Sequence, residues 1–304
     1  MSAHLRGFSK YLPERVLNNQ ELASRLGCTT QWIEESSGIH ERRWAAPEES
    51  IADMAVAAAK NNELATKPGL LLLSSGSAAT QGFPGPAAEV ADRLGWGGMP
   101  AIDLPIASAG SIFGLSLAAS LAPTYGNVLL IASEKMSSII ESHPLDANTA
   151  ILFGDGAGAV EVSATSGPWK IASSVLHSDG QYRESLSYRG TGALSMNGLS
   201  VILQASRKLP SVSAEALVAC AAQAKDVEAF LLHQANKNLI TRVAKSLEVP
   251  AERFFSNIDA YGNTSSASML IAAADYQPRV GKHVFAGFGA GFHWGAVEIG
   301  RAHV

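Results

Sequence analysis

The sequence contains little cysteine, little charge and no long apolar run, and each of these absences excludes a class of protein. Its two cysteines, Cys28 and Cys220, are far apart among 304 residues, which argues against both a disulfide framework and a zinc site. Charged residues make up only 16 %, with a net charge of −4 and no basic stripe of the kind that binds nucleic acid. No apolar run reaches the ~18 residues of a membrane span, and no signal peptide is visible. We therefore expect a soluble cytoplasmic protein with no nucleic-acid and no membrane partner.

Apolar residues and glycine are abundant instead. Hydrophobic residues make up 47 % and there are 28 glycines, enough for a large core, or two fused cores, with many tight turns. Continuous apolar runs at residues 70–74, 127–133 and 227–233 predict buried parallel strands. The order of strand, small-residue turn into a helix, and strand occurs in residues 1–165 and again in residues 166–304. This repeat predicts an α/β fold made of two similar halves.

Local signals place other elements. Asn18, Thr29 and Ser50 each precede a helical pattern and are preferred helix caps. Residues 150–162 are expected to form a glycine-laced strand pair. The Gly-Asp-Gly-Ala-Gly within it lacks both a Walker lysine and the G-x-G-x-x-G spacing, so close backbone packing explains these glycines better than phosphate binding does.

Ser108 occupies the turn between an apolar run and a helical pattern. Unpaired backbone N–H groups collect at such a helix N-terminus, and the helix dipole favours negative charge there. The hydroxyl can therefore cap the helix or attack a carbonyl carbon. His233 and Asn263 follow similar transitions. His233 could act as a proton acceptor or could be an ordinary half-buried histidine. Asn263 could act as an amide donor or could be a helix cap. Backbone N–H groups of residues 289–291 could complete an oxyanion hole near Ser108.

Short motifs spread over nearly the whole chain carry a resemblance to a known family. They are Tyr11-Leu-Pro-Glu14, Trp32-Ile33, Gly38-Ile-His-Glu-Arg42, Ala45-Ala-Pro47, Phe83-Pro84, Phe153-Gly-Asp-Gly-Ala-Gly-Ala159, His177-Ser-Asp-Gly180, His233-Gln-Ala-Asn236, Gly262-Asn-Thr-Ser265 and Gly289-Ala-Gly-Phe-His-Trp-Gly295. In this order they resemble the β-ketoacyl-acyl-carrier-protein synthases III of the thiolase superfamily. The resemblance implies a thiolase-like fold, with five αβαβα layers built from two duplicated halves, and a homodimer.

The same resemblance assigns roles to single residues. It implies a catalytic set of Ser108, His233 and Asn263, and an oxyanion hole made by the backbone N–H groups of Ser108 and Ala290. The substrate-binding residues that it implies are Trp32, Phe83, Phe153, Asn236 and Phe288. Trp32 would stand at the mouth of a pantetheine tunnel. The acyl chain would lie in an apolar tunnel closed by Phe288 and by the partner's Phe83.

One departure from the family pattern concerns the nucleophile, because the family has a cysteine where this chain has Ser108. A cysteine thiol has a pKa near 8.5, which a helix N-terminus lowers, whereas a serine hydroxyl needs a general base, and His233 is the candidate. The acyl-serine would be an ester, a weaker acyl donor to a carbanion than a thioester. The leading hypothesis is therefore an acyltransferase that moves an acyl group from a coenzyme A or carrier-protein thioester through acyl-Ser108 to an acceptor. It would serve fatty acid, polyketide or other secondary metabolite synthesis and would need no cofactor beyond the thioester.

Two alternatives stay open. The chain could be a decarboxylating β-ketoacyl-acyl-carrier-protein synthase III whose cysteine has been replaced by serine, naturally or by mutation, because His233 and Asn263 stabilise the enolate in condensing relatives. It could also be a non-catalytic partner subunit, although a dead site has no chemical need for these two residues.

A second departure concerns coenzyme A, whose phosphates the relatives grip with arginines and a lysine. Residues 146–148 contain no arginine, and Asn238 stands where another is expected. Fewer cations predict weaker phosphate recognition and favour a donor bound to an acyl carrier protein. The residues that could form a basic surface for this acidic partner, or could simply be solvated charges, are Arg42, Arg43, Lys237 and Arg242. His293 has either a pocket-lining or a structural role.

Overall fold

The computed structural model describes residues 3–80, 82–190 and 192–302. Nine strands form one mixed sheet in the order β11-β12-β13-β8-β1-β7-β6-β4-β5. The first group of strands is β1 (Ala3–Tyr11), β4 (Leu70–Ser74), β5 (Ala101–Leu104), β6 (Asn127–Glu134) and β7 (Gly156–Ser163). The second group is β8 (Trp169–Ser178), β11 (Val227–Leu232), β12 (Lys282–Gly289) and β13 (His293–Arg301). The antiparallel pairing of β1 with β8 joins the two groups.

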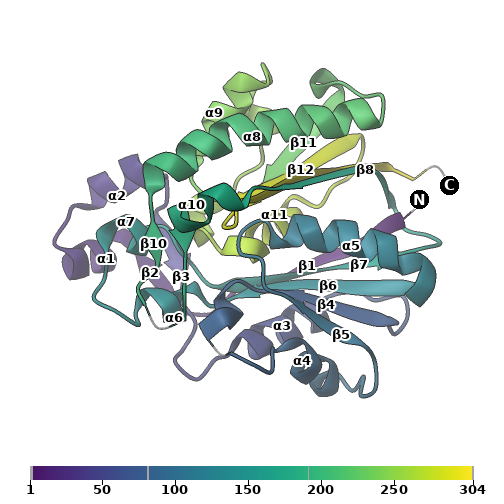
Figure 1. The fold of residues 1–304 in the computed structure, drawn as a ribbon, viewed down its shortest axis with the longest axis horizontal. Coiled ribbons are helices and arrows are strands. Elements are labelled where there is room, and N and C mark those ends of the chain that lie inside the picture. The colour runs from purple at the N-terminus through teal and green to yellow at the C-terminus, as the bar shows by residue number, and fades with distance from the viewer. Residues whose placement is uncertain (1–2, 81, 191, 303–304) are drawn as a thin grey trace.

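Five layers of helix and sheet stack on one another (Figure 1). The central layer, α5 (Gly110–Tyr125) and α11 (Ser268–Tyr276), lies between the two strand groups. The outer face of the second group is covered by α8 (Gly198–Ala219) and α9 (Lys237–Ser246). The outer face of the first group is covered by α3 (Ile51–Lys60) and α4 (Ala87–Arg93). The αβαβα order is the one that the family resemblance implies.

Shorter elements gather at one end of the layers, on the left of Figure 1. The helices among them are α1 (Asn19–Leu26), α2 (Thr30–Ser37), α6 (Met136–Ile140), α7 (Ala147–Ala150) and α10 (Ile258–Tyr261). Two small antiparallel pairs are β2 (Val16–Asn18) with β3 (Glu41–Arg43), and β9 (Leu186–Ser187) with β10 (Ser195–Met196). This end of the molecule receives the carboxyl ends of β4, β6 and β11, so it is the end at which the loops that follow these strands meet.

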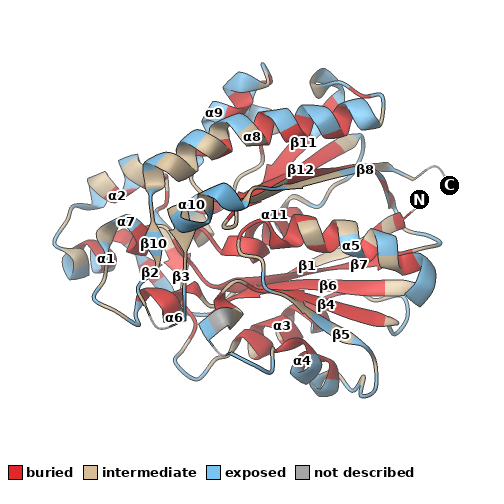
Figure 2. Cartoon of the chain, in the orientation of Figure 1, coloured by how far each residue is buried: buried red, intermediate tan, exposed pale blue. Residues whose placement is uncertain are grey.

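The central helices hold the core together. Figure 2 shows that burial is greatest on the strands and on the helix faces turned toward them. In α5, Ile112 and Leu115 are fully buried in one cluster with Leu130 of β6 and Leu231 of β11. Burying each of these side chains contributes about 1.5–3 kcal/mol. The same apolar contacts therefore fix α5 against both strand groups.

The expected strands and helix caps are confirmed. The apolar runs form β4, β6 and β11, and each pairs in parallel with a neighbour. The side chains of Asn18, Thr29 and Ser50 each accept a hydrogen bond from the backbone N–H three residues on, at 2.9–3.1 Å. At Ser50 the bond is reciprocal, because Asp53 accepts from the Ser50 N–H at 2.7 Å. These bonds satisfy N–H groups that would otherwise be unpaired at the start of each helix.

The strand pair expected at residues 150–162 is wrong, because β7 is the single strand there and it begins at Gly156. The chain before it bends around the buried carboxylate of Asp155, which accepts hydrogen bonds from the N–H groups of Ala45 and Ser137, each at 2.8 Å. Burial raises the pKa of Asp155 to about 6. The close packing expected of the glycines is present, since a Cβ on Gly158 would lie 2.6 Å from the Cβ of Leu270 in α11.

Within the described ranges, no helix is long and apolar enough to cross a bilayer. No three His, Cys, Asp or Glu side chains of these ranges gather as metal ligands would. Cys28 and Cys220 are both free thiols.

Candidate active site

Ser108 lies in the loop between β5 and α5 and has a strained backbone. Its φ of 61° falls in the left-handed region, which residues other than glycine occupy at a cost on the order of 1–3 kcal/mol. The N-cap of α5 is Ala109, and no side chain caps the helix, so the Ser108 hydroxyl does not act as the cap. Ser108 is 8 % exposed. The strained turn directs the hydroxyl to a cavity instead of to the helix end.

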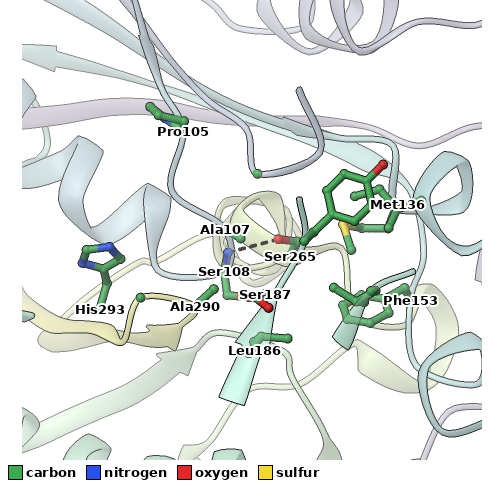
Figure 3. A pocket seen from close by; sticks show the side chains of 15 residues that line it. Pro105, Ala107, Ser108, Met136, Phe153, Leu186, Ser187, Ser265, Ala290 and His293 are labelled. Atoms are coloured by element: carbon green, nitrogen blue, oxygen red, sulfur yellow. Dashed lines mark hydrogen bonds between the residues drawn. The ribbon is translucent and has the colours of Figure 1, made fainter. Parts of the chain in front are cut away.

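Two segments hold this turn in place. The backbone N–H of Ser108 donates to the Oγ of Ser265 at 3.0 Å (Figure 3). Gly289, at the end of β12, packs directly behind it, because a Cβ there would lie 2.4 Å from the Ala107 carbonyl oxygen and 2.6 Å from the Ser108 Cβ. Ala290 follows at once and lines the same cavity as Ser108. The segment 289–291 and Ser108 are therefore neighbours.

His233 follows the last residue of β11 and is held at both its backbone and its ring. Its N–H donates to the Ala286 carbonyl oxygen at 2.8 Å, and its Nδ1 lies 2.7 Å from the Oγ of Ser268 in α11. The same Oγ accepts from the Gln234 N–H at 3.1 Å. Burial lowers the pKa of His233 to about 4, and a backbone hydrogen bond to Ser265 opposes this shift. The imidazole is therefore neutral at pH 7.

Asn263 is fixed by its backbone and its side chain. Its backbone pairs with the segment around Phe153, donating to the Leu152 carbonyl oxygen at 2.8 Å and accepting from the Gly154 N–H at 3.1 Å. Its Oδ1 accepts from the Ser265 N–H at 2.9 Å, which leaves the NH₂ group with a long contact of 3.5 Å to the Ala235 carbonyl oxygen. The Asn263 side chain therefore accepts a cap-like hydrogen bond through Oδ1 and still has a weakly engaged NH₂ group that can donate to a substrate.

Two cavities meet at Ser108. The first, of about 290 Å³, also touches Ala290 and His293 (Figure 3). Its apolar wall is formed by Met136, Ile139, Phe153, Leu186 and Leu194. The second, of about 90 Å³, runs along α8 and is lined by His233 and Asn263. Ser108 lines both cavities and so stands at the border between them. Among the described residues, no hydrogen bond joins the Ser108 hydroxyl to His233.

The other predicted substrate-binding residues are spread more widely. Phe288 and Asn236 line the second cavity, and Phe153 lines both. Trp32 is half-buried in α2, a helix that the Asn236 side chain touches through a 2.8 Å bond to the Ser36 carbonyl oxygen. Phe83 lines neither cavity and is 96 % exposed. Phe288 therefore lines the same cavity as His233 and does not line the first cavity, where the acyl chain was expected to be closed off by it.

Arg42 corrects one expectation. It was expected on a basic surface, but it is fully buried and cannot contact a partner. Its guanidinium donates to Asn19 Oδ1 at 2.7 Å and to the Ile151 carbonyl oxygen at 2.8 Å. Burial lowers its pKa to about 10, so it stays charged and serves as an internal brace. Lys237 and Arg242 are exposed on α9.

A buried glutamate supports the site and was not foreseen from the sequence. Glu134 ends β6 and is completely buried. Its carboxylate accepts from the N–H and Oγ of Ser77 at 2.8 and 2.7 Å and from the Oγ of Ser266 at 2.6 Å. Ser266 adjoins Ser265, the partner of the Ser108 N–H. The only available signal was an acidic residue closing an apolar strand, and its serine partners are too distant in sequence to be inferred.

The fold and this geometry define the class of protein. A nucleophile candidate just before a helix that lies between two strand groups, with a histidine and an asparagine from the second half of the chain lining an adjoining cavity, is the arrangement of a thiolase-fold ketosynthase, an enzyme of the acyltransferase type.

Comparison with known proteins agrees with this class. Residues 102–180 match 3-oxoacyl-[acyl-carrier-protein] synthase III, and residues 217–300 match the C-terminal part of the same family. The chain belongs to the 3-oxoacyl-acyl-carrier-protein synthase III family. The β-ketoacyl-[acyl-carrier-protein] synthase III of Nostoc sp. (strain PCC 7120) is 34 % identical over 96 % of each chain.

Solved structures give the same result. The crystal structure of 3-oxoacyl-[acyl-carrier-protein] synthase III from Aquifex aeolicus VF5 superposes with a TM-score of 0.92 at 33 % identity, covering 99 % of this chain and 100 % of that one. The enzyme from Pseudomonas aeruginosa PAO1 superposes with a TM-score of 0.93 at 32 % identity, covering 100 % of this chain and 99 % of that one. The expected thiolase-like fold is confirmed.

Proposed function

We propose that the protein takes an acyl group from a thioester, holds it as an ester on Ser108 and passes it to an acceptor. The observation that carries this proposal is the position of the Ser108 hydroxyl, on the border between an apolar cavity and a cavity that contains a neutral imidazole. A nucleophile, a proton acceptor and a path to each are the minimum that acyl transfer requires.

The chemistry uses only groups of the chain and the thioester. The Oγ of Ser108 forms a bond with the thioester carbonyl carbon, and its proton passes to Nε2 of His233. The C–S bond then breaks, and the proton moves from Nε2 to the departing sulfur. This step requires the tautomer in which Nδ1–H donates to the Ser268 Oγ, so that Nε2 is the unprotonated nitrogen. The step needs no prosthetic group, because no atom of the thioester or the serine is oxidised or reduced.

The negative charge on the carbonyl oxygen needs hydrogen-bond donors at the moment of attack. The backbone N–H groups of Ser108 and Ala290 are the proposed donors. In the free protein the Ser108 N–H donates to Ser265, so the substrate oxygen would share or replace this bond. The bond to Ser265 keeps the N–H oriented and paired until the substrate arrives.

The residues that line the two cavities suggest which part of the substrate each cavity receives. The first has an apolar wall suited to an acyl chain. The second is smaller and also mostly apolar, and the Asn263 amide and the Asn236 side chain are polar groups in its wall that suit the amide groups of a pantetheine arm. We therefore place the acyl chain in the first cavity and the pantetheine arm in the second, with the thioester at Ser108.

An acyl carrier protein is the proposed donor. The helix α9 borders the second cavity through Leu239 and exposes Lys237, Arg242 and Lys245. Its ten residues include no acid, so this face is positively charged and suits an acidic carrier. Exposed cations of this kind raise the association rate more than they raise affinity.

A homodimer is also proposed. Phe83 is an aromatic side chain that is 96 % exposed, and a large exposed apolar group of this kind is often covered by a partner. Ile102 on the sheet-edge strand β5 is 44 % exposed. We infer that a second copy covers this region and that the partner's Phe83 closes the first cavity.

Decarboxylative condensation is the second candidate, favoured by the neutral His233 and the Asn263 amide on one cavity wall. For this candidate the neutral imidazole carries its proton on Nε2, so that it and the Asn263 NH₂ group both donate hydrogen bonds to the enolate oxygen after carbon dioxide leaves. The two candidates differ in the acceptor, since condensation needs a malonyl thioester and yields a 3-oxoacyl product.

Mass spectrometry of the intact protein tests the proposal. After incubation with short acyl carrier-protein and coenzyme A thioesters, we expect an added acyl mass on the Ser108 peptide and none in Ser108→Ala. The absence of an adduct with every donor would refute acyl transfer. Malonyl carrier protein added to the preformed adduct then separates the candidates, because only condensation releases a 3-oxoacyl thioester.

A further inference from the structure

One wall of the first cavity differs in character from the rest. His293, the first residue of β13, brings an imidazole to a cavity that is otherwise lined by apolar side chains and by the hydroxyl-bearing residues Ser108, Ser187, Tyr188 and Ser265. In Figure 3, Ala290 lies between the His293 ring and Ser108. The imidazole is thus a polar group placed beyond the point at which the thioester would react.

Three contacts fix the orientation of this ring. Its Nδ1 lies 2.7 Å from the Oγ of Ser178. The Phe113 ring meets it edge-on, with the ring centroids 5.3 Å apart and the planes at 73°. The ring also lies across the Cα of Gly291, where a Cβ would come within 2.5 Å of Nε2. Any larger residue at position 291 would therefore push the ring out of place.

The second ring nitrogen, Nε2, has no hydrogen-bond partner among the described residues, while Nδ1 is occupied by Ser178. Burial lowers the pKa of His293 and so favours the neutral ring, which can form one hydrogen bond at Nε2. A saturated acyl chain would displace water from this nitrogen and could not form a hydrogen bond with it. A chain that carries an oxygen could replace the lost hydrogen bond.

We propose that His293 makes the first cavity selective for acyl groups that carry a hydrogen-bonding oxygen, a hydroxyl or a second carbonyl, over saturated chains of the same length. This proposal rests on the proposed function, because it concerns the acyl group that reaches Ser108. His293 is a specificity-determining residue here and takes no part in breaking or forming the ester.

The test compares matched thioesters and matched variants. The substrates are saturated four- to six-carbon acyl pantetheine thioesters and their counterparts with a hydroxyl at the second, third or fourth carbon. The variants are His293→Leu, which removes the hydrogen-bonding group, and His293→Gln, which has a similar volume and keeps one. The rate of adduct formation on Ser108 is followed by mass spectrometry, and circular dichroism checks that each variant is folded.

The native protein should acylate with the best hydroxylated donor about three- to tenfold faster than with its saturated counterpart, the worth of one hydrogen bond. The ratio should fall to about one in His293→Leu and return at least in part in His293→Gln. A native preference for saturated chains, or a ratio that His293→Leu leaves unchanged, would overturn the proposal.

A binding experiment separates this proposal from the proposed function. In Ser108→Ala, which cannot form the ester, calorimetry should show the same three- to tenfold preference for the hydroxylated donor, lost when His293→Leu is added. If no adduct forms on the native protein but this preference remains, acyl transfer fails and the selectivity stands. If adducts form without any preference, the selectivity alone is refuted.

Discussion

Replacing Gly289 by alanine should disturb the nucleophile without touching its chemistry. The added Cβ would lie 2.4 Å from the Ala107 carbonyl oxygen, 2.6 Å from the Ser108 Cβ and 3.0 Å from the Ala109 nitrogen. Packed carbon atoms keep about 3.5–4.0 Å between them, so the end of β12 and the Ser108 turn would have to separate by about 1 Å. Neither side can yield by rotating a flexible side chain, because the contacted atoms belong to the backbone or to a Cβ.

We expect the free energy of unfolding to fall by about 1–3 kcal/mol, as for other overpacked interiors. We also expect acylation to slow by up to ~100-fold, because a displacement of about 1 Å at a reacting centre can cost that much. Gly287→Ala is the matched control, since it lies on the same strand and its nearest contact is the Ile112 side chain at 3.2 Å.

Urea denaturation measures the loss of stability, and intact-protein mass spectrometry measures the rate of adduct formation. The reasoning is refuted if Gly289→Ala is as stable and as fast as Gly287→Ala. A variant that loses stability but keeps the native rate would show that the end of β12 does not position Ser108.

Three further predictions follow from the site. Burial lowers the pKa of His233 to about 4, so its proton-accepting form persists on acidification. The rate of acylation should therefore be nearly constant from about pH 8 to about pH 5 and should fall below that pH. An inflection near pH 6.5 in quenched-flow measurements would contradict this. In a urea titration, Glu134→Gln should lower the free energy of unfolding by about 2–4 kcal/mol, because an amide NH₂ would face backbone and hydroxyl donors. The control Glu35→Gln changes an exposed side chain and should have little effect in the same titration. In steady-state assays, Lys237→Glu combined with Arg242→Glu should raise KM for a carrier-protein donor about fivefold or more. KM for a short pantetheine thioester should not change. Equal effects on both donors would place these cations outside the carrier contact.

Much of the fold follows from local patterns in the sequence. An uninterrupted apolar run such as residues 128–132 is typical of a strand that is buried on both faces, and β6 is such a strand. The strand pair expected at residues 150–162 failed for a reason that no local pattern carries. Asp155 turns the chain there by binding Ala45 and Ser137, which are distant in sequence.

The candidate site could be predicted only in part. Ser108, His233 and Asn263 each mark a transition from apolar to polar residues, and this transition is visible in the sequence. The bond from the Ser108 N–H to Ser265 and the bond from Ser266 to Glu134 each link residues more than one hundred positions apart. Such contacts depend on how the two strand groups pack, and a single sequence contains no record of them.

The position of α5 has a consequence for how this chain could be divided. Strands β4, β6 and β7 of the first group and β12 and β13 of the second all touch this helix, which Ser108 directly precedes in the loop from β5. A fragment that ends after β7 would leave one side of α5 uncovered and would lack His233 altogether. Two separately produced fragments should therefore be inert alone and take up an acyl group only when they are recombined.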